Sequence, residues 1–259
     1  MSQPELPARF AVRESDAADM RAIQEFLDEA LITEVLNVIK SGKEATVYRC
    51  RAHPSLGAPF AAAKVYHTTG HRGFQRSAVY EEGRQFGAGQ VQRAVANRSE
   101  FGQKAQLGFW VDREFDMLSG LNYAGADVPA PYACTETAIL MEYLGDEDEA
   151  AVQLQHAEFG EGEAQDVLDR VLENIELLMR ENVIHADLSA FNILYHEGRI
   201  AIIDFPQAVD PRTNSSAKGL LERDITNIVQ FFQRQRAGLD EDPALMARNL
   251  WNLWKYGEV

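Results

Sequence analysis

The chain has 259 residues, of which 46% are hydrophobic and 25% charged, proportions that exclude a disordered or fibrous protein. It contains no run of about 18 apolar residues, so no membrane-spanning segment is expected. Twenty-five basic against 40 acidic residues give a formal charge of −15, which opposes binding to DNA, RNA or an anionic membrane. Cys50 and Cys134 lack the spacing of a metal site, and we expect reduced thiols in a cytoplasmic protein without a signal peptide.

The first part of the chain is predicted to form one helix and then strands. Apolar residues at spacings of three and four, from Met20 to Leu31, predict a helix over residues 16–31. The period then changes to that of extended chain, interrupted by turn signals. The expected strands are 35–39, 45–50 and 60–66, with a tight loop at 41–44 between the first two.

Residues 67–106 are rich in Gly, Gln, Arg and Ser and are too long for an ordinary connection, so we expect a flexible insertion there. The segment 64–113 holds eight basic and four acidic residues. It is interpreted either as a solvated surface enriched by chance or as a flap for an anionic partner.

The rest of the chain alternates between a few strands and longer helices. Helices are predicted over 106–121, around 167–179 with an end at Asn182, and over 217–234 and 243–256. A strand is expected at 138–144 and a hairpin at 193–203, while 145–162 is the expected junction between lobes. This order favours a two-lobed α+β protein, divided into residues 1–143 and 144–259.

Two charged residues stand out in the first lobe. Lys64 lies within an apolar strand, where a lysine is costly to bury unless it is paired. The alternative is a side chain that lies along the surface with its head in water. Glu114, on the helix that would turn Phe115 and Leu118 to the core, is the candidate partner.

The most specific segment runs from His185 to Asn192, between a long helix and a hairpin. Asp187 and Asn192 lie five residues apart, and Asp204 follows the second hairpin strand. Phosphoryl transfer needs a carboxylate near the acceptor and oxygen ligands for Mg²⁺. Together with the strand lysine and the helical glutamate, these residues predict a phosphotransferase.

The arrangement resembles protein kinases, and more closely the RIO family of atypical serine kinases, in the branch of its first-numbered member. Residues 41–48 (SGKEATVY) are similar to the family's phosphate loop, one residue shorter. Residues 185–194 (HADLSAFNIL) are similar to its catalytic loop, with Phe191 in place of Tyr. Residues 202–207 (IIDFPQ) resemble its metal loop, and 221–228 its following helix. The resemblance implies a kinase-like fold, with a small β-rich N-lobe and a helical C-lobe, of the RIO type without an activation segment.

The resemblance also implies a role for each matching residue. Asp187 would be the catalytic aspartate, and Asp204 a metal ligand and candidate phosphoacceptor. Asn192 would be the other metal ligand. The residues implied in binding ATP are Ser41, Gly42, Lys43, Val47, Lys64, Glu114, Met141, Glu142 and Tyr143. Of these, Lys64 would pair with Glu114, and 141–143 would form the hinge whose backbone, at Glu142 and Tyr143, reaches the adenine.

The implied function is transfer of the ATP γ-phosphate to serine or, through an aspartyl-phosphate, to water, with Mg²⁺ or alternatively Mn²⁺. The partners would be ATP and an unidentified protein substrate. Archaeal and eukaryotic family members act on precursors of the small ribosomal subunit, a role that the −15 charge opposes here. The alternatives are a small-molecule phosphotransferase of the aminoglycoside or choline kinase type, a non-catalytic scaffold, and an ATP-dependent assembly factor.

Overall fold

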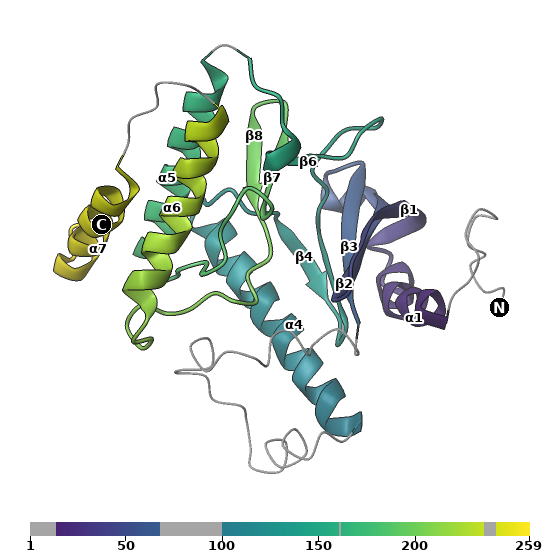
Figure 1. The fold of residues 1–259 in the computed structure, drawn as a ribbon. Helices are drawn as coiled ribbons and strands as arrows, with labels where there is room; N and C mark the ends of the chain where they lie inside the picture. Colours follow the sequence, from purple (N-terminus) through teal and green to yellow (C-terminus); the bar gives the residue numbers. More distant parts are fainter. Residues whose placement is uncertain (1–13, 68–99, 161, 236–241) are drawn as a thin grey trace.

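A computed structural model gives the fold, and it describes residues 14–67, 100–160, 162–235 and 242–259 (Figure 1). The central part of the predicted insertion, with its cluster of basic residues, lies outside these ranges. Among the described helices, none has the length and apolar character needed to cross a bilayer.

One antiparallel sheet of five strands dominates the first part of the chain. Its order is β1-β2-β3-β5-β4. Strands that are consecutive in the sequence therefore pair with each other, except β3 and β4, which β5 separates. The bounds are β1 Ile32–Ser41, β2 Ala45–Ala52, β3 Phe60–Tyr66, β4 Pro131–Cys134 and β5 Ala138–Glu142. Val47 faces Lys64 across β2 and β3, and Lys64 faces Ile139 across β3 and β5. Lys64 therefore lies in the middle of the sheet.

Helix α1 (Glu14–Asp28) covers one face of this sheet. Ile23 and Phe26 are fully buried in a separate cluster with Tyr48, Cys50, Ala61 and Ala63. A long helix, α4 (Glu100–Tyr123), contacts β4 and β5 and runs below the sheet in Figure 1. The sheet is thus placed between a short N-terminal helix and the main core.

The second part of the chain is built on helices around a small sheet. Helices α5 (Glu163–Arg180) and α6 (Ala217–Gln235) pack side by side, and α7 (Pro243–Tyr256) lies on α6 (Figure 1). The hairpin β7 (Ile193–His196) and β8 (Arg199–Ile202) pairs with β6 (Val152–Gln153). Both turn residues, Glu197 and Gly198, have positive φ (46° and 80°), as a two-residue type I′ turn requires.

Several boundaries differ from the sequence prediction. Helix α1 ends at Asp28 and not at 31, because Ala30 takes a left-handed conformation (φ 54°) from which Leu31 leaves the helix. Strand β1 is longer than 35–39, and Ser41 belongs to it rather than to the loop. Helix α4 begins at Glu100, so the last residues of the predicted insertion are helical. Glycine is a poor helix former, so Gly102 and Gly108 weaken the helical signal and made the predicted helix begin too late, at residue 106.

Three further elements had weak local signals. The prolines at 129 and 131 indicated only a break, yet Pro131 opens β4, an edge strand where a proline is tolerated. The two-residue strand β6 lies within the predicted lobe junction. Strand β5 ends at Glu142, two residues before the predicted end. The two predicted C-terminal helices are confirmed almost to the residue.

Candidate active site

A cleft of about 750 Å³ lies between the sheet and the hairpin β7–β8. Its walls come from the β1–β2 turn, the β3 lysine, α4, the segment after β5, and residues at the end of β8. The predicted ATP-site residues that line it are Gly42, Lys43, Val47, Lys64, Glu114, Met141, Glu142 and Tyr143, together with Asp204. Ser41 does not line the cleft.

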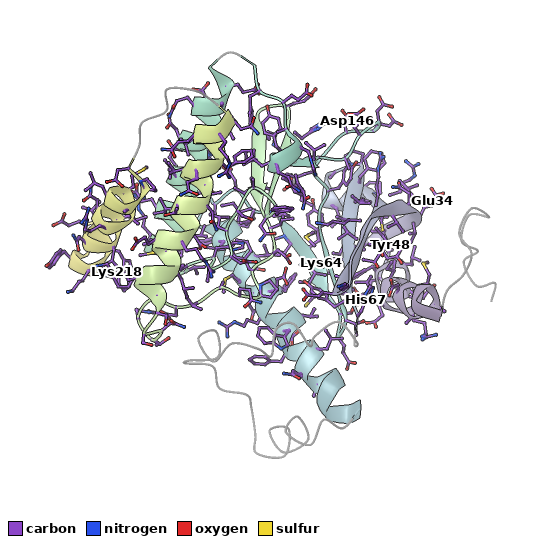
Figure 2. All side chains as sticks on the ribbon, in the orientation of Figure 1. Glu34, Tyr48, Lys64, His67, Asp146 and Lys218 are labelled. Carbon is purple, nitrogen blue, oxygen red and sulfur yellow. The ribbon has the colours of Figure 1, made fainter. Side chains whose placement is uncertain are left out.

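Lys64 forms the centre of the site. Its ammonium nitrogen lies 2.8 Å from Glu114 Oε1 and 2.9 Å from Asp204 Oδ1. Figure 2 labels the lysine on its strand. Burial disfavours the ammonium charge, but the two carboxylates outweigh it and hold the pKa of Lys64 well above its usual range. Lys64 therefore stays charged, and the predicted pair with Glu114 is confirmed.

Tyr66, two residues along the same strand, completes this pair and was missed in the sequence. Its hydroxyl donates to Glu114 Oε2 at 2.6 Å, so each carboxylate oxygen has its own donor. Burial, followed by the charge of Glu114, raises the pKa of Tyr66 well above its usual range. The neutral hydroxyl orients the carboxylate toward Lys64.

Asp204 follows β8 in a left-handed backbone conformation (φ 75°). Such a conformation is costly for a residue with a side chain and is found where the surroundings fix it. The charge of Lys64 is the main cause that lowers the pKa of Asp204, against the effect of burial. The group is therefore an ionised carboxylate, as a metal ligand or a nucleophile must be.

Asn192 is brought next to Asp204 by the hairpin. Ile193 pairs with Ile202, and the amide of Ile203 donates to the carbonyl of Asn192 at 2.9 Å. The Asn192 amide nitrogen donates to the backbone carbonyl of Asp187 at 2.8 Å. This bond uses the side-chain nitrogen of Asn192, and the side-chain oxygen takes no part in it.

Asp187 is exposed on a loop whose backbone is hydrogen-bonded to helix α6. The buried carboxylate of Asp224, on α6, accepts hydrogen bonds from the amides of Ala186 (2.7 Å) and Leu188 (3.0 Å). Arg223 donates to the Ala186 carbonyl, and Ala186 itself has a φ of 63°. Asp224 thus fixes the backbone on both sides of Asp187.

His185 joins this loop to the metal loop. Its Nε2 lies 3.0 Å from the Ile203 carbonyl oxygen and must carry the proton, because a carbonyl only accepts. Burial lowers the pKa of His185, so the ring is neutral. The imidazole ring also packs against the Phe205 ring, with 4.8 Å between the two ring centroids.

One backbone group of the predicted hinge is already bonded within the protein. The Glu142 amide donates to the Ala130 carbonyl at 2.8 Å and is not available to a ligand. Leu144 lines the cleft, and its amide has no acceptor among the described residues. The Tyr143 side chain packs edge-on against Phe60.

Glu44 is a further acidic residue of the cleft that the sequence analysis left without a role. Burial raises its pKa, and the charges of Asp204 and Asp187 raise it further, against the effect of Lys64. Glu44 and Asp204 line the same cleft, so the β1–β2 turn contributes a carboxylate of its own to it. Only its place in the cleft identifies it, because in the sequence Glu44 is one acidic residue among many.

The comparisons with known proteins agree with this geometry. The model of the RIO domain matches residues 46–244. The RIO-type serine/threonine-protein kinase Rio1 of Haloferax volcanii is 32% identical over 244 residues, 90% of this chain and 76% of that protein. The serine/threonine-protein kinase RIO1 of Homo sapiens is 26% identical, and the match covers 86% of this chain but 39% of the human protein.

Solved structures show the same fold. A crystal structure described as the Rio2 kinase-ADP/Mg²⁺-phosphoaspartate complex from Chaetomium thermophilum superposes with a TM-score of 0.67 and 20% identity. It covers 92% of this chain and 66% of the other. The match to the RIO domain spans more than half of the chain and includes Lys64, residues 185–194 and Asp204. The chain therefore belongs to the RIO family of atypical serine/threonine protein kinases, in the Rio1 branch.

Proposed function

We propose that this protein is an ATP- and Mg²⁺-dependent kinase that transfers the γ-phosphoryl group to serine, on itself or on a protein substrate, or to water through an aspartyl-phosphate. The observation that carries this proposal is the buried Lys64 held between Glu114 and Asp204. A buried cation in a cleft that Lys40 and Lys43 also line is suited to a polyphosphate.

Nucleotide binding follows from the residues around this cation. Lys64 would exchange Asp204 for the α- and β-phosphate oxygens and keep its bond to Glu114. Gly42 and Lys43, in the β1–β2 turn, would cover the phosphates: the Gly42 amide bonds to the Ala45 carbonyl and shapes the turn, and Lys43 offers its ammonium group. The Leu144 amide, which has no acceptor among the described residues, is the proposed donor to the adenine, with Met141 and Val47 as apolar walls.

Asn192 and Asp204 are the residues proposed to hold Mg²⁺. They offer an amide oxygen and a carboxylate, the hard oxygen ligands that this ion prefers beside substrate phosphates. When bound, the ion would neutralise phosphate charge. Mn²⁺ takes similar oxygen ligands and is the alternative metal.

Asp187 and Asp204 have different proposed roles in the chemical steps. For transfer to serine, Asp187 accepts the hydroxyl proton while the serine oxygen bonds to the γ-phosphorus and the bond to ADP breaks. For the ATPase route, an Asp204 oxygen attacks the γ-phosphorus and ADP leaves. Water then attacks the acyl phosphate, gives its proton to Asp187, and releases inorganic phosphate with Asp204 restored.

The proposed partners are ATP and a protein carrying the acceptor serine. Assembly of a small-ribosomal-subunit precursor is the proposed context only if the basic segment 64–113 compensates for the acidic remainder. The two free cysteines support a reducing compartment such as the cytoplasm. A small-molecule phosphotransferase is the second candidate, and it shares the catalytic loop.

The test is incubation of the purified protein with Mg²⁺ and ATP labelled on the γ-phosphate, with α-labelled ATP as control. We expect free phosphate and protein-bound label from γ-labelled ATP alone. Hydroxylamine should remove the label from an acyl phosphate at Asp204 and leave phosphoserine.

Wild-type protein that neither releases phosphate nor becomes labelled would overturn the proposal. Label that moves only to an added aminoglycoside or choline would favour the second candidate. If all bound label survives hydroxylamine, the aspartyl-phosphate route is wrong.

A further inference from the structure

A buried carboxylate on α1 has no part in the proposed mechanism. Asp19 is only 4% exposed, at the interface between α1 and the sheet. Its Oδ2 accepts a hydrogen bond of 2.9 Å from the Tyr48 hydroxyl and lies 3.6 Å from His67 Nε2. Because burying a carboxylate is costly, the bond from Tyr48 and the nearby His67 ring fix the position of α1 on the sheet. Figure 2 labels Tyr48 and His67 close to α1.

His67 connects the same place to the phosphate loop. Its Nε2 lies 3.0 Å from the hydroxyl of Thr46, at the start of β2, and its backbone amide donates to the Glu44 carbonyl at 2.8 Å. The Thr46 hydroxyl in turn lies 3.5 Å from that of Ser41, on the other side of the loop. A path of polar contacts thus runs from α1 to both ends of residues 42–44.

His67 Nε2 makes its hydrogen bond to the Thr46 hydroxyl, whereas its separation of 3.6 Å from Asp19 Oδ2 is a longer polar contact. The bond to Thr46 can run in either direction: a protonated Nε2 donates to the Thr46 oxygen, and an unprotonated Nε2 accepts the Thr46 hydroxyl hydrogen. Either direction joins His67 to Thr46.

We propose that His67 is a positioning residue that fixes the phosphate loop to α1. It restricts residues 42–44 before nucleotide arrives, so less ordering is needed when the phosphates bind. The inference rests on the proposed function, because it assumes that the loop covers phosphates. It explains why Thr46 and Asp19, both buried polar groups outside the cleft, lie in one network.

The test compares His67→Ala and Thr46→Val with the wild type in Mg²⁺-ATP binding and steady-state turnover. Loss of one such bond should raise KM and Kd for ATP by about three- to tenfold, with kcat changed by less than about twofold. His67→Gln, whose amide can donate from a similar position, should restore most of the affinity. In the Thr46→Val background, His67→Ala should add little, because the two residues act through one contact.

A second readout needs no nucleotide. In the free protein, hydrogen exchange of the Gly42 amide, which donates to the Ala45 carbonyl at 2.9 Å, should accelerate in His67→Ala. His53→Ala is the matched control, since the His53 side chain, among the described residues, bonds to Ser55 in a surface turn away from the loop. It should change neither exchange nor affinity.

The outcomes separate the inference from the function beneath it. If wild-type protein binds ATP and His67→Ala binds it equally well, with unchanged exchange at Gly42, the inference is wrong and the proposed function stands. If His67→Gln fails to restore affinity, or if the two substitutions add fully, His67 does not act through Thr46. If wild-type protein binds no ATP, the proposed function fails, while altered exchange would still report the contact.

Discussion

Replacing Glu114 by glutamine removes one charge from the buried group around Lys64 while keeping the size of the side chain. Breaking a buried ion pair by removing one partner costs about 3–5 kcal/mol, because a charge is left uncompensated. Here Asp204 remains 2.9 Å from the ammonium, and the glutamine oxygen can still accept a bond. We therefore expect a loss of about 2 kcal/mol in the free energy of unfolding.

Urea denaturation of Glu114→Gln, Lys64→Met and the double variant measures this coupling. Lys64→Met leaves the Glu114 carboxylate buried with only the Tyr66 hydroxyl, so it should cost about 3 kcal/mol. The double variant should be more stable than the sum predicts by at least about 1 kcal/mol, because the second substitution removes the charge that the first left unpaired.

The exposed pair Arg51–Glu34, with side chains 53% and 59% exposed, provides the control. Glu34→Gln should change stability by less than about 0.5 kcal/mol, because water screens such a pair. A Glu114→Gln variant as stable as Glu34→Gln, or losses at Lys64 and Glu114 that simply add, would refute the argument that the two act as one buried pair.

Three further predictions address the catalytic loop and the cysteines. Asp187→Ala should retain ATP binding and reduce turnover by roughly 10²–10⁴, the contribution of a positioned acid–base group; unchanged turnover in a γ-phosphate release assay would remove it from the mechanism. Burial raises the pKa of Asp224 to about 7. Since the folded state then holds a proton that the unfolded state has lost, its contribution to stability should fall as pH rises from about 4 to about 7. Urea titrations at pH 5 and pH 7.5 should show this slope in the wild type and a smaller one in Asp224→Asn; equal slopes would contradict it. Burial also raises the pKa of Cys50 to about 12, so at pH 8 a thiol reagent should modify Cys134 before Cys50 in native protein and both in urea; equal native rates would count against this burial.

Much of the fold is legible in the sequence because its signals are local. The helical periodicity of α5, α6 and α7 and the turn between β7 and β8 depend on neighbours within a few residues, and they were predicted closely. The catalytic loop and Asp204 could be recognised for the same reason, since their spacing is set by one short hairpin. Elements with weak local signals, such as the edge strand β4, were missed.

The sequence by itself determined the candidates: the residues predicted to hold a phosphate, a metal ion and an acceptor hydroxyl. Only the tertiary structure decided which groups support them: Tyr66 on Glu114, Asp224 under the loop of Asp187, and Asp19 with His67 behind the phosphate loop. These partners come from different helices and strands, and Asp224 lies 36 residues from Leu188. Hydrogen bonds between residues so far apart in the sequence depend on how the helices and strands pack. The residues around each partner therefore carry no local pattern that would predict the bond.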